Sequence, residues 1–425
     1  MIKKLTKNFD GWFSNLKISL LMFSVFYVSR LIEITTIGID FHIINIFSKL
    51  IRYLCYLYFI LAICFRVKNV RFKSINKYIQ SMNKKQVALL TVIILTILSI
   101  VINMLLTSDR TLFMLIIVLC YMSIYSIDYI IDVEAALQYF SMLFVVTLCS
   151  LGLISNYIIF RPDGGVRYSV GFTYPTNLSQ IIMFILLYWG YKKKFILEFK
   201  EISLIQIFIV FMYILTDSRT EFIVCEFIIL VVLSKKIGIV KKLNKLICLC
   251  EKLFVHLFLL IPLGTLGIVF GYGYAFENLE STNAILVGFN KLNDLLSYRV
   301  YQTWYNFKFY GTSLFGSNVD LIGNGIQSTR KFANIRSNFI DNEYMNILFS
   351  RGIIVFIMIM ILITITLLYL YKTKNHNLLF ISFIILMFGI MNPRIIDILY
   401  SVFMFIVVYA IKEILIGGKK DNGTV

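Results

Sequence analysis

Residues 84–106 read KKQVALLTVIILTILSIVINMLL, and the stretch after the two lysines carries no charge. A helix that crosses a membrane needs about 20 mainly apolar residues, so this stretch is typical of a span. Similar runs recur along the chain and predict about twelve spans. They lie near residues 17–37, 46–66, 86–106, 111–130, 136–156, 175–191, 201–216, 219–235, 253–272, 343–371, 377–391 and 395–416.

The composition favours the same class of protein. The chain has 425 residues, of which 59% are hydrophobic and 15% charged, and its mean hydropathy is +0.83. A soluble domain is roughly 45–50% apolar and about 25% charged, so a soluble enzyme with an anchor is excluded. Polar Glu33, Thr35 and Thr36 follow the first apolar run, which predicts a span and not a cleaved signal. We expect an all-α, polytopic integral membrane protein.

The charges between the spans predict its orientation. Lysine clusters keep loops in the cytoplasm, and the loop 66–85 is rich in lysine and arginine. With an even number of spans, both termini are then cytoplasmic. The net charge of +18 therefore indicates topology and contact with anionic lipid, not nucleic-acid binding. The lysine loops hold Lys192–Lys194, Lys235, Lys236, Lys241, Lys242 and Lys245, whereas the opposite loops hold Arg161, Arg167, Arg219, Arg299, Arg330, Arg336 and Arg394.

Two segments on the outer side stand out, the short loop 157–175 and the long loop 273–341 between the ninth and tenth spans. We expect residues 1–425 to form one membrane domain, with the long loop as a cap over the site. Within that loop, residues 291–310 have the amphipathic pattern of a helix on the membrane surface. Its aromatic side chains indicate either an interfacial anchor or a platform that stacks on sugars.

Arg167, Arg219 and Arg299 are predicted to lie at the outer membrane face, each near a turn rich in Gly, Asn or Ser. A planar guanidinium binds phosphate through two parallel hydrogen bonds. Together the three could hold the diphosphate of a lipid carrier, whose charge lies at that depth. The alternative is that each arginine pairs with a local acid or with a lipid head group. Arg30, inside the first span, is expected to pair with Glu33 three residues later.

Asp341 and Glu343 mark the end of the long loop. Either carboxylate could take the proton from an attacking hydroxyl. The alternative is a helix cap, with Asp341 or Asn342 as the capping residue and Glu343 in the first turn. A divalent metal on this pair is disfavoured, because hard cations need more oxygen ligands than the sequence offers nearby. The seven cysteines and three histidines are scattered and predict neither a disulfide framework nor a metal site.

The outer segments together resemble the superfamily of Wzy-type polysaccharide polymerases and O-antigen ligases. The resemblance covers residues 150–400 and rests on ordered motifs. These are RYSVGFTYPTN (167–177), TDSRT (216–220), LSYR (296–299) with Trp304 and Phe315-Gly316, and DNEYMN (341–346) before Gly352. It implies that Arg167, Arg219 and Arg299 bind the lipid pyrophosphate, and that no nucleotide or metal cofactor is needed.

Two departures from the family pattern are visible. Thr176 separates Pro175 from Asn177. Ligase relatives usually have a histidine, assigned as the acceptor base, where this chain has Asp341. The absence of this histidine favours a polymerase. The expected catalytic groups are then Arg299 and a base, which is either Asp341 or Glu343. Trp304, Tyr301 and Tyr174 are the side chains expected to contact the glycan.

The sequence thus predicts a capsular or exopolysaccharide polymerase in a bacterial cytoplasmic membrane. It would transfer a growing glycan from undecaprenyl pyrophosphate to the next lipid-linked oligosaccharide repeat unit. Its partners would be this substrate, the bilayer, a chain-length regulator and a flippase. A ligase that moves glycan to another acceptor, and a transporter of polysaccharide or lipid, are the alternatives.

Overall fold

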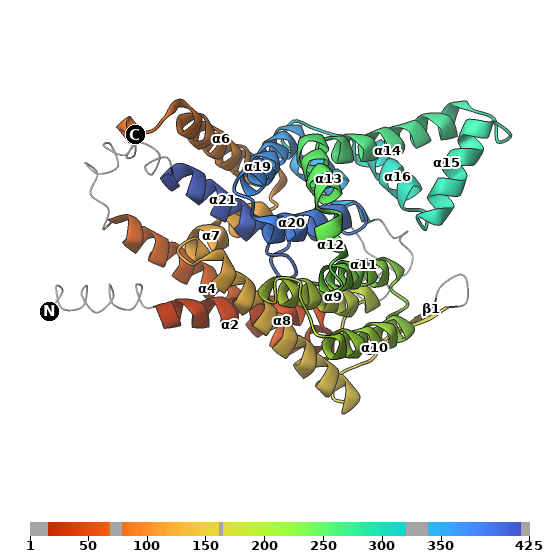
Figure 1. The fold of residues 1–425 in the computed structure, drawn as a ribbon, viewed down its shortest axis with the longest axis horizontal. Coiled ribbons are helices and arrows are strands. Elements are labelled where there is room, and N and C mark those ends of the chain that lie inside the picture. Colours follow the sequence, from red (N-terminus) through yellow and green to blue (C-terminus); the bar gives the residue numbers. More distant parts are fainter. Residues whose placement is uncertain (1–15, 69–78, 161–164, 320–338, 418–425) are drawn as a thin grey trace. The chain divides into compact units, whose positions relative to one another are not determined.

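The structure is a computed structural model that describes residues 16–68, 79–160, 165–319 and 339–417. The described chain is mostly helical, with one sheet made of β1 (Ile158–Phe160) and β2 (Val166–Tyr168) (Figure 1). These strands pair antiparallel, with Ile159 opposite Arg167. The expectation of an all-α protein is confirmed except for this hairpin. Arg161, Arg330 and Arg336 of the predicted outer loops lie outside the described residues.

Six of the described helices are long and apolar enough to cross a membrane, which indicates a membrane protein. The predicted total of twelve spans stays a prediction. Helices α2 and α11 have sufficient length but carry several charges, such as Arg30 and Glu33 in α2. The six are α4 (His42–Lys68), α6 (Lys84–Thr107), α8 (Ile127–Ser150), α10 (Phe199–Thr216), α14 (Leu260–Asn278) and α19 (Ile353–Lys372).

Several predicted helices are interrupted, and each prediction is corrected accordingly. The span 343–371 is broken at Gly352, whose φ of +89° is unfavourable for other residues. The span 253–272 is broken before α14, where Pro262 lies in the first turn and has no N–H to continue a preceding helix. The surface helix 291–310 is two helices, because Ser297 and Tyr298 adopt positive φ.

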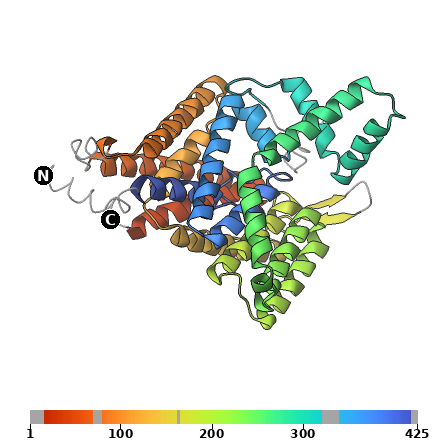
Figure 2. The same ribbon diagram turned by 45° about the horizontal axis from the view of Figure 1, so that its top comes forward.

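The chain divides into two compact units, and α6 and α7 (Thr111–Met122) pass from one to the other. Unit 1 contains residues 1–87, 114–239 and 398–425. Within it, α8 packs on α9, and α9, α10 and α11 pack together (Figures 1 and 2). Its other helices are α2 (Leu16–Ile34), α3 (Ile37–Asp40), α9 (Pro175–Lys192), α11 (Arg219–Lys236) and α21 (Phe403–Gly417).

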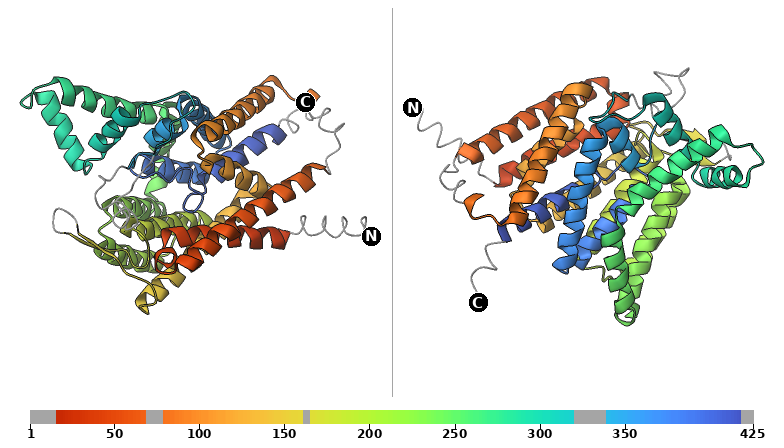
Figure 3. Two further views of the ribbon diagram at one scale, coloured as in Figure 1. Left: turned by 180° about the vertical axis from the view of Figure 1, so that it is seen from behind. Right: turned by 90° about the horizontal axis from the view of Figure 1, so that it is seen from above.

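Unit 2 contains residues 88–113 and 240–397. Helix α14 packs on α15, α16 and α18, and α19 packs on α13, α18 and α20 (Figure 3). The short α12 (Ile239–Lys242) lies at the boundary of the units. The remaining helices are α13 (Asn244–Leu257), α15 (Ala284–Leu295), α16 (Arg299–Tyr310), α18 (Glu343–Arg351) and α20 (His376–Phe388). The sequence predicts one domain with an outer cap. This prediction depends on how the two units are joined, and it stays a prediction.

A close backbone crossing in unit 2 fixes the break between α18 and α19. The N–H groups of Ile353 and Ile354 donate to the carbonyls of Ser313 and Leu314, both at 3.0 Å. These bonds satisfy first-turn donors of α19 that have no partner within the helix. Asn103 of α6 secures the crossing, because its Nδ2 donates to Phe315 O at 2.6 Å.

Replacing Gly352 with alanine should disrupt this crossing. The added methyl group would overlap Gly316 N and the carbonyl of Leu314, and φ is +89°. We expect Gly352→Ala to lower the free energy of unfolding by about 2–5 kcal/mol. Gly288→Ala in α15 is the matched control, since nothing lies within 4 Å of its added methyl group, and it should be neutral or stabilise by about 0.5–1 kcal/mol. Thermal unfolding in detergent measures both, and equal melting temperatures would contradict the argument.

Candidate functional site

Arg167 connects the β-hairpin of unit 1 to the turn between α10 and α11. Its side chain is buried, with 6% exposed. Nε donates to the carbonyl of Thr216, the last residue of α10, at 2.8 Å. The other guanidinium nitrogens lie 3.4 Å from Ser218 Oγ and from the hydroxyl of Tyr174. Arg167 therefore braces the turn through one strong bond, and its two outer nitrogens make only long contacts.

The loop that follows Arg167 is fixed by the end of α2. The N–H of Thr36 donates to Gly171 O at 2.9 Å, and the N–H of Thr173 donates to Ile34 O at 2.9 Å. Phe172 between them is fully buried. Pro175 then begins α9, where its missing N–H costs nothing. Residues far apart in the sequence thus hold the segment from Arg167 to Tyr174.

Arg219 is the first residue of α11 and, unlike Arg167, it is exposed. Its side chain is 59% exposed, and Nε lies 3.6 Å from Asp217 Oδ1. Asp217 adopts a left-handed conformation with φ of 44°, which turns the chain sharply between the two helices. Backbone N–H groups at a helix start favour anions, so Arg219 is suited to contact a phosphate while Arg167 supports the turn.

Two buried polar residues beside this turn were missed by sequence reasoning. Gln180 of α9 donates through Nε2 to Glu221 Oε1 at 3.1 Å, and both side chains are buried. Glu221 also lines a small cavity with Ser179, Thr216 and Ser218. A glutamate in the first turn of an apolar helix, two residues after Arg219, was the available signal. Its usual interpretation is interaction with the helix dipole.

In unit 2, Arg299 begins α16 and pairs with Asp341. The distance from Nε to Oδ2 is 2.7 Å, and the two side chains are 29% and 25% exposed. Asn342, not Asp341, caps α18, because its side chain accepts from Met345 N at 3.1 Å. The capping alternative is therefore confirmed for Asn342, and Asp341 is left to bind Arg299. Burial raises the pKa of Asp341, against the opposing charges of Arg299 and Arg394.

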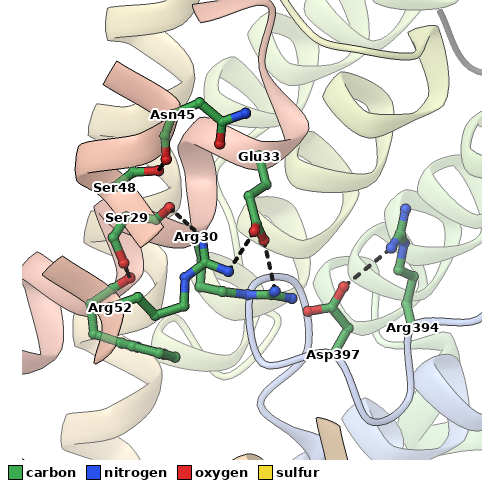
Figure 4. Close-up of polar contacts among 9 residues, drawn as sticks. Ser29, Arg30, Glu33, Asn45, Ser48, Arg52, Arg394 and Asp397 are labelled. Carbon is green, nitrogen blue, oxygen red and sulfur yellow. Dashed lines mark hydrogen bonds and ion pairs between the residues drawn. The ribbon is translucent and has the colours of Figure 1, made fainter. Parts of the chain in front are cut away.

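Glu343 lies in the first turn of α18 and is fully buried. Its N–H donates to Gly389 O at 2.8 Å. Burial and the negative charge of Asp397 raise the pKa of Glu343 to about 7, although Arg394 opposes the rise. Arg394 also pairs with Asp397 at 3.1 Å (Figure 4). Asp397 was missed by sequence reasoning, and Arg394 was recognised only as an outer arginine.

The aromatic residues proposed for glycan contact differ in exposure. Trp304 is 7% exposed and packs against Tyr272 and Phe276 of α14, with ring centroids at 6.2 and 5.3 Å. Tyr301 stands beside it on α16, with the centroids 5.8 Å apart. The ring of Tyr174 lies 5.4 Å from the guanidinium carbon of Arg167. Trp304 therefore joins α16 to α14, whereas Tyr301 and Tyr174 are partly exposed.

A separate ion network joins α2 and α4 in unit 1. Arg30 pairs with Glu33 at 2.8 Å, as the sequence predicted, and Arg52 of α4 binds the second carboxylate oxygen (Figure 4). Arg52 also donates to the carbonyl of Ser29 at 3.2 Å. Polar groups within apolar helices are costly unless paired, so this network stabilises the packing of α2 on α4.

The structure brings Arg167 and the segment of Arg219 together in unit 1, and in unit 2 it pairs Arg299 with Asp341, two residues before Glu343. Convergence of the three arginines on one diphosphate stays a prediction. Within the described ranges, no three His, Cys, Asp or Glu side chains are grouped as a metal ion would require. Comparisons with protein families, curated proteins and solved structures find no match to this chain.

The raised pKa of Glu343 predicts a pH-dependent stability. The pKa rises from 4.5 to about 7 on folding, so the folded chain holds the proton more tightly than the unfolded chain. The resulting stability is fully present below the unfolded pKa and is lost as the pH rises through the folded pKa. We expect a loss of about 3 kcal/mol between about pH 5 and about pH 8.

Glu343→Gln should remove most of this pH-dependent loss of stability, because glutamine does not titrate. Thermal unfolding at a series of pH values measures the stability of both proteins. Glu277→Gln is the control, since Glu277 is 42% exposed and pairs with Lys308 at the surface. This control should keep the wild-type pH dependence. An unchanged pH dependence in Glu343→Gln would show that Glu343 does not carry a raised pKa.

Proposed function

We propose that this protein is a metal-independent membrane glycosyltransferase that polymerises lipid-linked oligosaccharide repeat units into a surface polysaccharide. It acts at the outer face of a bacterial cytoplasmic membrane, with both termini in the cytoplasm. Its substrate is a glycan on undecaprenyl pyrophosphate. Because the donor bond is already activated by the diphosphate, no nucleotide is consumed. A flippase that supplies the repeat unit and a regulator of chain length are the expected partners.

The proposal rests mainly on a hydrogen bond that joins two of the sequence motifs from which the proposal came. Arg167 Nε donates to Thr216 O at 2.8 Å, and the two residues are 49 apart in the sequence. This contact places the RYSVGFTYPTN segment beside the TDSRT segment. An exposed Arg219 next to a buried Arg167 supports binding of a diphosphate, which needs several positively charged hydrogen-bond donors.

In the proposed reaction, a sugar hydroxyl of the acceptor repeat unit attacks the anomeric carbon of the donor glycan. The new C–O bond forms as the bond from that carbon to the diphosphate oxygen breaks. Arg167, Arg219 and Arg299 stabilise the negative charge on the leaving diphosphate. The hydroxyl proton passes to Asp341 or Glu343. Asp341 also fixes Arg299 through the 2.7 Å pair, while the raised pKa of Glu343 suits a proton acceptor near neutral pH.

Transport is a second candidate function, and one observation favours it. Residues 398–402 are non-helical although they are buried in unit 1. Unwound segments of this kind bind ions and substrates in membrane transporters. The arginine clusters are better explained by surface chemistry on a phosphorylated lipid, so polymerisation is preferred.

A census of lipid-linked glycans by mass spectrometry, in the native host with the gene deleted, tests the proposal. Single repeat units on the carrier, with loss of polymer, are the expected result. Full-length polymer retained on the carrier would instead indicate a ligase. An unchanged glycan pool would overturn both and favour transport.

Conservative variants test the role of the arginines in the same assay. Lysine keeps the charge but lacks the planar fork, so Arg219→Lys and Arg299→Lys should each slow polymerisation by roughly tenfold to a hundredfold. Arg110→Lys is the matched control, because Arg110 is exposed in the loop between α6 and α7. It should keep the wild-type distribution of polymer length. The same distribution in Arg299→Lys would contradict the role proposed for Arg299.

A further inference from the structure

Two consecutive residues of α9 hold the turn that precedes Arg219. Ser179 Oγ lies 2.8 Å from the hydroxyl oxygen of Thr216, the last residue of α10. Gln180 Nε2 donates to Glu221 Oε1 at 3.1 Å, and Glu221 lies in the first turn of α11. A single helix therefore binds the end of α10 and the start of α11, on both sides of the turn that joins them.

Hydrogen bonds, more than close packing, fix the position of this turn. A cavity of about 20 Å³ lies between α9, α10 and α11, and its polar lining is Ser179, Thr216, Ser218 and Glu221. Side chains beside a void lack part of the contacts that hold a packed core in place. Ser179, Gln180, Thr216 and Glu221 are each 7% exposed or less. Their bonds are therefore shielded from water and hold the turn where packing is incomplete.

The burial of Glu221 needs an explanation beyond its place at a helix start. A carboxylate at the solvent-exposed start of a helix interacts favourably with the helix dipole. Glu221, however, is only 3% exposed, and burying a carboxylate is costly unless it is paired. Its bond to Gln180 meets part of this cost and ties the first turn of α11 to α9. Arg219, in the same turn of α11, is 59% exposed.

We propose that Gln180 and Glu221 are positioning residues that hold Arg219 ready to bind a diphosphate. This role rests on the proposed function, in which Arg219 binds the diphosphate of the lipid carrier. A binding group is most effective when the residues around it fix its position before the ligand arrives. Anchoring the first turn of α11 on α9 lowers the entropy that is lost when the guanidinium binds its ligand. Gln180 and Glu221 act through the backbone of α11 and do not contact the diphosphate.

Binding of inorganic pyrophosphate to the purified full chain in detergent tests this role. Arg219→Ala should weaken binding roughly tenfold to a hundredfold, because it removes a charged hydrogen-bond donor. Gln180→Leu removes the bond to Glu221 and should weaken binding roughly threefold to tenfold. In an Arg219→Ala background, Gln180→Leu should have almost no effect, since the residue that Gln180 positions is absent. A purely structural role would weaken binding equally in both backgrounds.

Gln206→Leu is the matched control. Gln206 of α10 also donates to a glutamate of α11, Glu226, but Glu226 lies two turns beyond Arg219. The control should therefore keep the pyrophosphate affinity of the parent. Should Gln180→Leu fail to fold, Gln180→Asn replaces it, because its shorter amide no longer reaches Glu221. The same dependence on Arg219 is then expected.

Two results would overturn the role of Gln180, and they differ in what they say about Arg219. The parent could bind pyrophosphate while the variant at Gln180 binds it equally well, or is weakened equally in both backgrounds. Gln180 then does not position Arg219, and the proposed function stands. If the parent does not bind pyrophosphate, the diphosphate-binding role of Arg219 fails together with this inference, and the census of lipid-linked glycans decides separately whether the protein is a polymerase.

Discussion

The backbone of a membrane protein must satisfy its own hydrogen bonds, because the hydrocarbon core offers no water. Helices meet this requirement locally, and every break in a helix needs partners from elsewhere. The break at Gly352 is satisfied by the carbonyls of Ser313 and Leu314. The non-helical residues before α21 are satisfied by side chains, such as Tyr27 and Tyr188. These two breaks are therefore tied to segments of the same unit that lie far away in the sequence.

The same constraint explains what the sequence could predict. Long apolar runs identified helices such as α6 and α19, because a helix depends on its own residues. The Arg30–Glu33 pair was also predictable, since its members are one turn apart, whereas Arg52 joins them from another helix. The interruptions at Gly352 and at Ser297 were not predicted. The partners at the Gly352 break come from the distant residues 313 and 314, and a single sequence does not show which segments meet. The turn at Ser297 is closed by local bonds to Asp294 O and Asn293 O, and no Gly or Pro in the sequence marks it.

The candidate site shows a similar division. Their predicted position at the outer membrane face identified Arg167, Arg219 and Arg299 as a set, but it did not predict which groups they bind. Arg167 binds a backbone carbonyl, a group that every residue possesses and that no sequence motif distinguishes. Asp341 and Asn342 were equal candidates for the helix cap. The structure separates them, since a cap needs an extended backbone at the residue next to the helix.

The hydrogen bond from Tyr27 to Leu399 joins residues 372 positions apart. Unit 1 therefore begins with α2 and is completed only when α21 has been synthesised, with all of unit 2 made in between. During translation, the early helices enter the membrane before the chain has synthesised the segment that their polar side chains bind. A chain that stops before residue 398 would keep those groups exposed to lipid, which gives membrane quality control a means of recognising incomplete copies.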